Sequence, residues 1–356
     1  MAYLKLYREK LRDNYEFLNR LFKENDIYWG VTTKLLCGHE EYLEEVAQLG
    51  IGEMHDSRVS NLKKIKEMHP EVMTAYIKPP PPDTIESVVK YADASLNTEL
   101  ATLHELSKEA ERQDKMHKVI VMIEMGDLRE GVMRDDIFDF YKEVFELPNI
   151  DVIGIGTNLN CMHGVMPDED KLIQLSLYKQ IIELKFDKKI RLVSGGTTVT
   201  IPLLLNHKLP AGINHFRVGE ALFFGNNLFT EGTIEGMHSG VMELFPQIIE
   251  ITEKPMVPSG DMGTNPQGEK AEINKEDYGK TSYRAILDIG YLDIDPKHLI
   301  SVSDDVNIAD ASSDMLIVDV GDNESGYEVG DFIPFRMTYM GALAIMNSSY
   351  IDKTVA

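Results

Sequence analysis

The sequence has little cysteine and no long apolar run. Its 356 residues include only two cysteines, Cys37 and Cys161, which is too few for a disulfide framework and leaves no Cys-x-x-Cys pair for a metal. No window reaches the roughly 18 consecutive apolar residues of a membrane span. The N-terminal segment carries charges where a secretory signal needs an apolar stretch. We therefore expect free thiols and a cytoplasmic protein.

Positive charge is also scarce. The chain has 36 Lys and Arg against 59 Asp and Glu, a formal net charge of −23. A surface of this sign repels nucleic acid and anionic membranes, so we expect a small-molecule partner, with no nucleic acid and no membrane. The hydrophobic content of 43% is sufficient for sizeable cores, and the length predicts two domains.

Residues 1–239 repeat one pattern, in which a short apolar run is followed by a stretch with apolar residues at helical spacing. Eight such units in roughly 200 to 250 residues are typical of a (β/α)8 TIM barrel, whereas a doubly wound sheet has fewer strands. The predicted fold class is therefore α/β, with an extra helix from Leu4 to about Asn25 before the first strand. The predicted strands are Ile27–Lys34, Ile51–Asp56, Val72–Lys78, Ala92–Thr98, Val119–Gly126, Val152–Leu159, Ile190–Gly195 and His215–Gly219.

Residues 240–356 show strand patterns without long helices between them, which predicts a second, mostly β domain. Eight basic and 21 acidic side chains give residues 241–356 a net charge of −13. This charge indicates a solvated acidic surface or attraction of a cationic substrate. The segment Pro258–Asp277, rich in Gly, Pro and Asn, is predicted to be a long loop. The predicted strands are Val241–Thr252, Ser282–Gly290, Met315–Val320 and Asp331–Thr338.

Barrel enzymes carry their chemistry at the carboxyl ends of the strands. Lys34 ends the first predicted strand, and glycine-rich turns at Ser194–Thr198 and Gly219 follow the seventh and eighth, where barrels commonly seat a phosphate on backbone N–H groups. Pyridoxal phosphate requires this combination, because a lysine forms a Schiff base with its aldehyde while its phosphate is anchored separately. We therefore predict pyridoxal phosphate as the cofactor.

An ordered set of segments carries a family resemblance. They are Ile27–Lys34, Gly126–Gly131, Gly154–Leu159, Ser194–Gly196, His215–Ala221 and, in the β domain, Ala311–Asp319. Together they resemble the alanine racemase fold type (fold type III) of pyridoxal phosphate enzymes, and within it most closely the ornithine racemase-like amino-acid racemases. The resemblance implies an isomerase that interconverts the L- and D-forms of ornithine or another basic amino acid. It also implies a homodimer in which the β domain of each chain completes the partner subunit's active site.

The resemblance also implies roles for single residues. Lys34 is the expected Schiff-base lysine, Asp314 a catalytic residue from the β domain, and Arg217 the partner of the pyridine nitrogen. Because an arginine keeps its proton, the nitrogen stays unprotonated and the ring is a weaker electron sink, which favours reprotonation over decarboxylation. No metal ligand is expected. The other residues assigned to cofactor binding are Arg129, Asn158, Ser194, Thr197, Thr198, Gly219, Glu220 and Tyr350.

The group that acts on the second face of the substrate is left open. Racemisation through an external aldimine needs one group to remove the α-proton and another to return it on the opposite face. The relatives use a tyrosine in a Ser-Tyr-Gly turn, where this chain reads Asp261-Met262-Gly263. The candidates for this group are Tyr278, Tyr283, Tyr291, Cys161, His55 and Asp261.

Substrate choice is open as well. A basic substrate needs a carboxylate for its distal ammonium group. Two other functions fit the pattern: a pyridoxal phosphate-binding protein without catalysis, and an alanine or broad-specificity racemase. The candidate carboxylates are those of Asp56, Asp127, Asp261 and Asp314.

Overall fold

A computed structural model describes residues 1–230, 232–264, 268 and 273–356. The chain forms two compact units. The barrel unit is Tyr7–Val241, and the β unit combines Met1–Leu6 with Met242–Ala356. Part of the predicted loop Pro258–Asp277 lies outside the described residues.

The barrel unit contains one eight-stranded parallel sheet, in the order β8-β7-β6-β5-β4-β3-β2-β9. A bridge between Gly196 and Phe216 joins the two ends of this sheet. The eight predicted strands are therefore confirmed, and they form a nearly closed TIM-like barrel. The strands are β2 (Tyr28–Thr32), β3 (Glu53–Asp56), β4 (Met73–Tyr76), β5 (Ala94–Asn97), β6 (His117–Met122), β7 (Ile150–Gly156), β8 (Leu192–Ser194) and β9 (His215–Val218).

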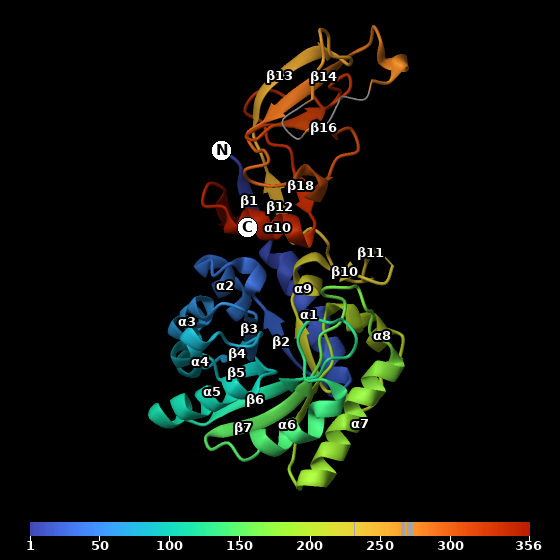
Figure 1. Cartoon of the computed structure of the whole chain (residues 1–356). Coiled ribbons are helices and arrows are strands. Elements are labelled where there is room, and N and C mark those ends of the chain that lie inside the picture. The colour runs from blue at the N-terminus through green and yellow to red at the C-terminus, as the bar shows by residue number, and fades with distance from the viewer. Residues whose placement is uncertain (231, 265–267, 269–272) are drawn as a thin grey trace. The chain divides into compact units, whose positions relative to one another are not determined.

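Helices cover the outside of the barrel, as Figure 1 shows for α2 to α7 around β2 to β7. Their apolar residues recur at helical spacing and face inward; α1, for example, buries Leu11, Leu18 and Phe22. None of the described helices is long and apolar enough to cross a bilayer. The helices are α1 (Arg8–Glu24), α2 (Glu40–Ala47), α3 (Val59–Met68), α4 (Ile85–Tyr91), α5 (Leu100–Arg112), α6 (Ile137–Val144), α7 (Glu169–Phe186), α8 (Ile201–Leu205) and α9 (Glu220–Phe224). A short hairpin, β10 (Asn226–Asn227) with β11 (Gly232–Thr233), follows α9.

The β unit has two sheets, ordered β15-β18-β12-β1-β19 and β13-β14-β17-β16. All neighbouring strands in them are antiparallel except β1 and β19. The prediction of a mostly β C-terminal region is thus confirmed. Its elements are β1 (Tyr3–Leu6), β12 (Met242–Phe245), β13 (Ile248–Pro255), β14 (Thr281–Leu287), β15 (Leu299–Ser301), β16 (Asn307–Ala311), β17 (Leu316–Asp319), β18 (Phe335–Met337), α10 (Tyr339–Asn347) and β19 (Asp352–Val355).

Two predicted elements were wrong. The N-terminal helix does not begin at Leu4, because residues 3–6 form strand β1, which pairs with residues 242–245 far along the chain. The predicted strand Val241–Thr252 is two strands, since Pro246 has no N–H to continue the ladder. Helix α10 was missed because its apolar residues show no clear helical face.

Candidate active site

Lys34 and Glu220 meet where β2 and β9 lie side by side. Val31 pairs with Val218, and Lys34 and Glu220 follow these residues by three and two positions. Lys34 is exposed in a short 3-10 turn, and Glu220 is half-buried. Burial raises the pKa of Glu220, while a hydrogen bond from Asn226 (2.9 Å) and the charge of Lys34 oppose that rise. The structure therefore brings the predicted lysine and Glu220 together at the mouth of the barrel, by which we mean the residues that follow the carboxyl ends of β2 to β9.

The turn that presents Lys34 is held by its buried neighbour Thr33. The hydroxyl of Thr33 lies 3.1 Å from Asp56 Oδ2 and 3.1 Å from the His55 carbonyl oxygen. The Asp56 carboxylate also accepts from the Arg58 N–H (2.9 Å) and from Asn61 Nδ2 (3.1 Å). Asp56 is fully buried and its oxygens are engaged in the fold, so it is not available to a substrate ammonium group.

The glycine-rich turn after β8 lies against the start of α9. Thr198 Oγ1 accepts a hydrogen bond from the Ala221 N–H at 3.0 Å, and Thr197 caps the 3-10 helix Thr198–Thr200. At Gly196 a Cβ would lie 2.1 Å from the Phe216 ring, so only glycine fits there. Gly219 is the N-cap of α9. Thr197, Thr198, Gly219 and Glu220 are thus gathered where sequence reasoning placed a phosphate.

Arg217 is buried at the carboxyl end of β9 and is held by four acceptors. Its Nη1 donates to the Ser194 carbonyl oxygen (3.0 Å) and hydroxyl, and its Nη2 to the Thr157 carbonyl oxygen (2.9 Å) and Asn158 Oδ1 (2.6 Å). Burial lowers the pKa of Arg217 to about 10, against the opposing charge of Glu130, so the group is charged at neutral pH. Within the described part of the chain no side chain accepts from Arg217 Nε, which leaves this donor for a ligand atom.

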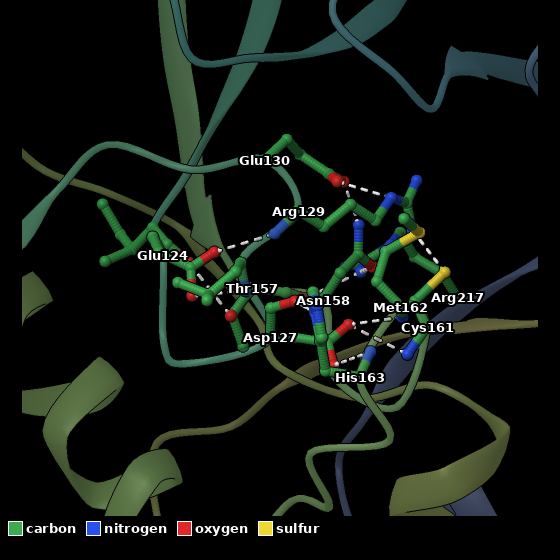
Figure 2. A network of polar contacts seen from close by, with 12 residues as sticks. Glu124, Asp127, Arg129, Glu130, Thr157, Asn158, Cys161, Met162, His163 and Arg217 are labelled. Atoms are coloured by element: carbon green, nitrogen blue, oxygen red, sulfur yellow. Dashed lines mark hydrogen bonds and ion pairs between the residues drawn. The ribbon is translucent and has the colours of Figure 1, made fainter.

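The network continues to Arg129, as Figure 2 shows. Asn158 Nδ2 donates to Glu130 Oε1, and Glu130 Oε2 pairs with Arg129 Nε at 2.6 Å. Arg129 Nη1 lies 2.8 Å from Cys161 Sγ. Arg217, Asn158 and Arg129, which were predicted separately, therefore belong to one network. Glu130 connects them, and sequence reasoning did not single it out because a charged loop residue carries no pattern.

Asp127 anchors the loop of residues 160–165. Its carboxylate accepts hydrogen bonds of 2.9 to 3.2 Å from the backbone N–H groups of Cys161, Met162, His163 and Val165 (Figure 2). Burial raises the pKa of Asp127, but these four donors outweigh burial and lower the pKa overall. Asp127 has no exposed surface. Its charge is used within the fold, so the prediction that it binds a substrate ammonium group has no support.

Asp314 and Tyr350 lie in the β unit. Asp314 is exposed in the turn between β16 and β17, where the hydroxyl groups of Ser312 and Ser313 each lie 3.1 Å from its carboxylate. Tyr350 is 82% exposed between α10 and β19. These two residues are therefore open to contact by another molecule.

The candidates for the group that acts on the second face of the substrate differ in their exposure and contacts. Tyr278, Tyr283 and Tyr291 of the β unit are exposed. By contrast, His55 is fully buried inside the barrel against Glu53, and Cys161 Sγ contacts Arg129. Cys161 and Cys37 are both free thiols, as predicted.

Comparison with known proteins agrees with this geometry. The chain is 39% identical over 345 residues to the ornithine racemase of Acetoanaerobium sticklandii, covering 97% of this chain and 96% of the relative. It is 32% identical over 324 residues to the lysine racemase of Thermotoga maritima, covering 90% and 89%.

Solved structures share the fold. An alanine racemase from Clostridium difficile 630 superposes with a TM-score of 0.77 at 16% identity, covering 100% of this chain and 95% of that one. The alanine racemase of Bartonella henselae with covalently bound pyridoxal phosphate gives 0.75 at 14% identity, covering 100% and 99%. The barrel and the β unit define the class of proteins with the alanine racemase fold. The chain belongs to the alanine racemase N-terminal domain family, whose model matches residues 7–227.

Proposed function

We propose that this chain racemises a basic amino acid, with ornithine preferred. It is a pyridoxal phosphate-dependent amino-acid racemase. The observation that carries the proposal is its likeness to the ornithine racemase over nearly the whole length of both chains. The lysine racemase, whose substrate is also a basic amino acid, supports the same substrate class. We place the protein in the cytoplasm.

The residues at the mouth fit the cofactor. Bound to a substrate amine, pyridoxal phosphate withdraws electrons from the Cα–H bond. Lys34 supplies the exposed amine, and Thr197 and Thr198 with the turn of Gly219 and Glu220 supply polar groups for the phosphate. Ser194 is fully buried and its hydroxyl contacts Arg217 and His215, so it acts on the cofactor only through Arg217. Arg217 Nε is the donor left for the ring nitrogen.

Lys34 takes the α-proton from one face of the substrate and returns it there in the reverse direction. Glu220 lies half-buried beside it, and the charge of Lys34 lowers the pKa of the Glu220 carboxyl against the effect of burial. Arg217 would donate to the ring nitrogen and, because an arginine keeps its proton, would leave that nitrogen unprotonated. Arg129, fixed by Glu130, orients the substrate carboxylate, and Asn158 holds Arg217 in place.

The β unit of a partner subunit completes each site in a homodimer. Asp314 then enters the partner's site as a catalytic residue, and Tyr350 contacts the phosphate. The exposure of both side chains in this chain supports that assignment. With Asp56 and Asp127 engaged within the fold, Asp261 and Asp314 are the candidates for the distal ammonium group.

The substrate assignment is tested by following optical rotation of the holoenzyme with the L- and D-forms of ornithine, lysine and alanine. We expect kcat/KM for ornithine to exceed that for alanine by roughly 10²- to 10⁴-fold, because a site built for an ammonium group leaves its carboxylate unpaired with alanine. Equal rates with alanine would indicate a broad-specificity racemase. Cofactor binding with no change of rotation for any amino acid would indicate a binding protein.

The shared site is tested by complementation. Lys34→Ala and Asp314→Asn chains, each inactive alone, are mixed and allowed to exchange subunits. In a 1:1 mixture half of the dimers are hybrids with one intact site, so about a quarter of the wild-type activity should return. If the mixture stays inactive although hybrids form, Asp314 does not act across the interface.

A further inference from the structure

A chain of polar side chains, all but the half-buried Glu53 fully buried, lies inside the barrel next to Arg217. Glu53 and His55 come from β3, Ser194 from β8 and His215 from β9. Ser194 Oγ lies 2.7 Å from His215 Nδ1, and Glu53 Oε1 lies 3.4 Å from His215 Nε2 and 2.7 Å from His55 Nε2. Ser194, His55 and His215 have no exposed surface. None of these residues contacts the cofactor or the substrate in the function proposed above.

The chain begins at Arg217, which can only donate. Its Nη1 donates to Ser194 Oγ, and the serine hydroxyl is hydrogen-bonded to His215 Nδ1. The other ring nitrogen, His215 Nε2, makes no hydrogen bond within the described residues and lies 3.4 Å from Glu53 Oε1. The chain thus runs from the guanidinium through a hydroxyl and an imidazole to a carboxylate.

The charged groups of this chain act on one another. Burial raises the pKa of Glu53, but His55 and His215 outweigh burial and hold it well below its usual range. Burial lowers the pKa of His55, so this imidazole is neutral at pH 7. Glu53 is among the groups that raise the pKa of Arg217 against the effect of burial.

We propose that Glu53 is a positioning residue that acts through His215 and Ser194 to hold the Arg217 guanidinium aimed at the cofactor ring nitrogen. The proposal rests on the role of Arg217 given above. Gly30 on β2 makes the arrangement possible. A Cβ at that position would lie 2.6 Å from His55 Nε2 and 2.9 Å from Glu53 Cγ.

A bound metal ion is the competing explanation. One donor atom from each of Glu53, His55 and His215 lies within 4.8 Å of the others. Two ligands at 2.0–2.1 Å from a tetrahedral zinc ion lie about 3.3 Å apart. The 3.4 Å between His215 Nε2 and Glu53 Oε1 matches this separation, but the 2.7 Å between His55 Nε2 and Glu53 Oε1 is a hydrogen-bond distance. The shorter contact therefore favours the polar chain over a metal ion.

The test compares the affinity of the apo protein for pyridoxal phosphate with its affinity for the carbocyclic analogue, in which C–H replaces the ring nitrogen. The ratio of the two dissociation constants reports the contact at the ring nitrogen, because general damage to the fold weakens the binding of both ligands by the same factor. For the wild type we expect a preference of roughly tenfold or more for pyridoxal phosphate. In Glu53→Gln and in Ser194→Ala the preference should fall to about twofold.

The barrel offers matched controls. Ser95 Oγ and His117 Nε2 form a second buried serine–histidine pair at 2.8 Å, on β5 and β6. Glu44 Oε2 and His69 Nε2 form a glutamate–histidine pair at 2.8 Å on the outside of the barrel. Ser95→Ala and Glu44→Gln should leave the preference unchanged. Ser194→Thr, which keeps the hydroxyl, should restore the preference that Ser194→Ala loses. If Glu53→Gln does not fold, the comparison of Ser194→Ala with Ser194→Thr tests the proposal.

Each result has one meaning. An unchanged preference in Glu53→Gln and Ser194→Ala would overturn the proposal while leaving the role of Arg217 intact. A stoichiometric metal ion in the wild type that Glu53→Gln loses would overturn it in favour of a metal site. A wild type that binds both ligands equally would contradict the role of Arg217 itself, and the positioning role with it.

Discussion

The two units of this protein use polar residues in opposite ways. Of the 20 buried polar or charged residues in the described part of the chain, 19 lie in the barrel unit, and Ser282 alone lies in the β unit. Residues 241–356 nevertheless carry −13 of the net charge of −23. Buried polar groups are costly unless they are hydrogen-bonded, so the barrel keeps them where geometry must be fixed. The charge of the β unit lies in solvent and acts mainly through its long-range field.

The largest effect should come from Lys34→Ala. Removing the amine removes both the covalent attachment of the cofactor and one proton-transfer group, so racemisation should fall by about 10³-fold or more. The absorption band of the covalently bound cofactor should disappear. Lys78→Ala provides the control, because Lys78 also follows a barrel strand, β4, at its carboxyl end. A band that survives in Lys34→Ala would show that another lysine binds the cofactor.

Replacing a buried arginine should cost stability in the barrel and little in the β unit. Arg217→Met leaves the acceptors of Thr157, Asn158 and Ser194 without their donor, which should lower the free energy of unfolding by about 3 to 4 kcal/mol. Arg284→Met removes a single 3.2 Å bond to the Met256 carbonyl oxygen and should cost about 1 kcal/mol or less. Urea unfolding measures both. Equal losses of unfolding free energy in Arg217→Met and Arg284→Met would contradict the contrast between the two units.

Acid should destabilise the barrel through His117. Burial lowers the pKa of His117 to about 4, whereas the unfolded chain binds this proton near pH 6.5. The contribution of His117 to the free energy of unfolding is therefore fully present above about pH 6.5 and is lost as the pH falls toward 4. The loss between pH 7 and pH 4.5 is about 2.5 kcal/mol. His117→Gln should remove this part of the pH dependence, and His69→Gln, on the barrel surface, should not. Urea titrations at the two pH values measure the free energy of unfolding. If it falls with pH as steeply in His117→Gln as in the wild type, the role of His117 is contradicted.

The smallest effect should come from the acidic surface of the β unit. Asp322 and Glu324 are exposed, so Asp322→Asn with Glu324→Gln should change the free energy of unfolding by about 0.5 kcal/mol or less. Thermal unfolding at low salt, where charge effects are largest, measures this. A change above about 1 kcal/mol would mean that this surface is structurally engaged, as the barrel interior is.

The sequence predicted the barrel well because strands of a parallel sheet are buried on both faces and appear as short apolar runs. Topology then brought Lys34, Arg217 and the Ser194–Thr198 turn to one end. What was missed depends on contacts that no local pattern encodes. Strand β1 forms because residues 242–245 and 352–355, far along the chain, pair with it on either side. For Glu53 and His55 a signal was present, since charged and titratable residues two apart in a buried strand share one face.

The central claim is tested most directly by incubating the holoenzyme with L-ornithine in heavy water and following optical rotation and deuterium at Cα together. We predict loss of rotation accompanied by one deuterium at Cα, and neither signal in Lys34→Ala. Deuterium without loss of rotation would mean that only one face is served. The absence of both signals in the wild type, with ornithine and with lysine, would contradict the assignment of this chain as a racemase of basic amino acids.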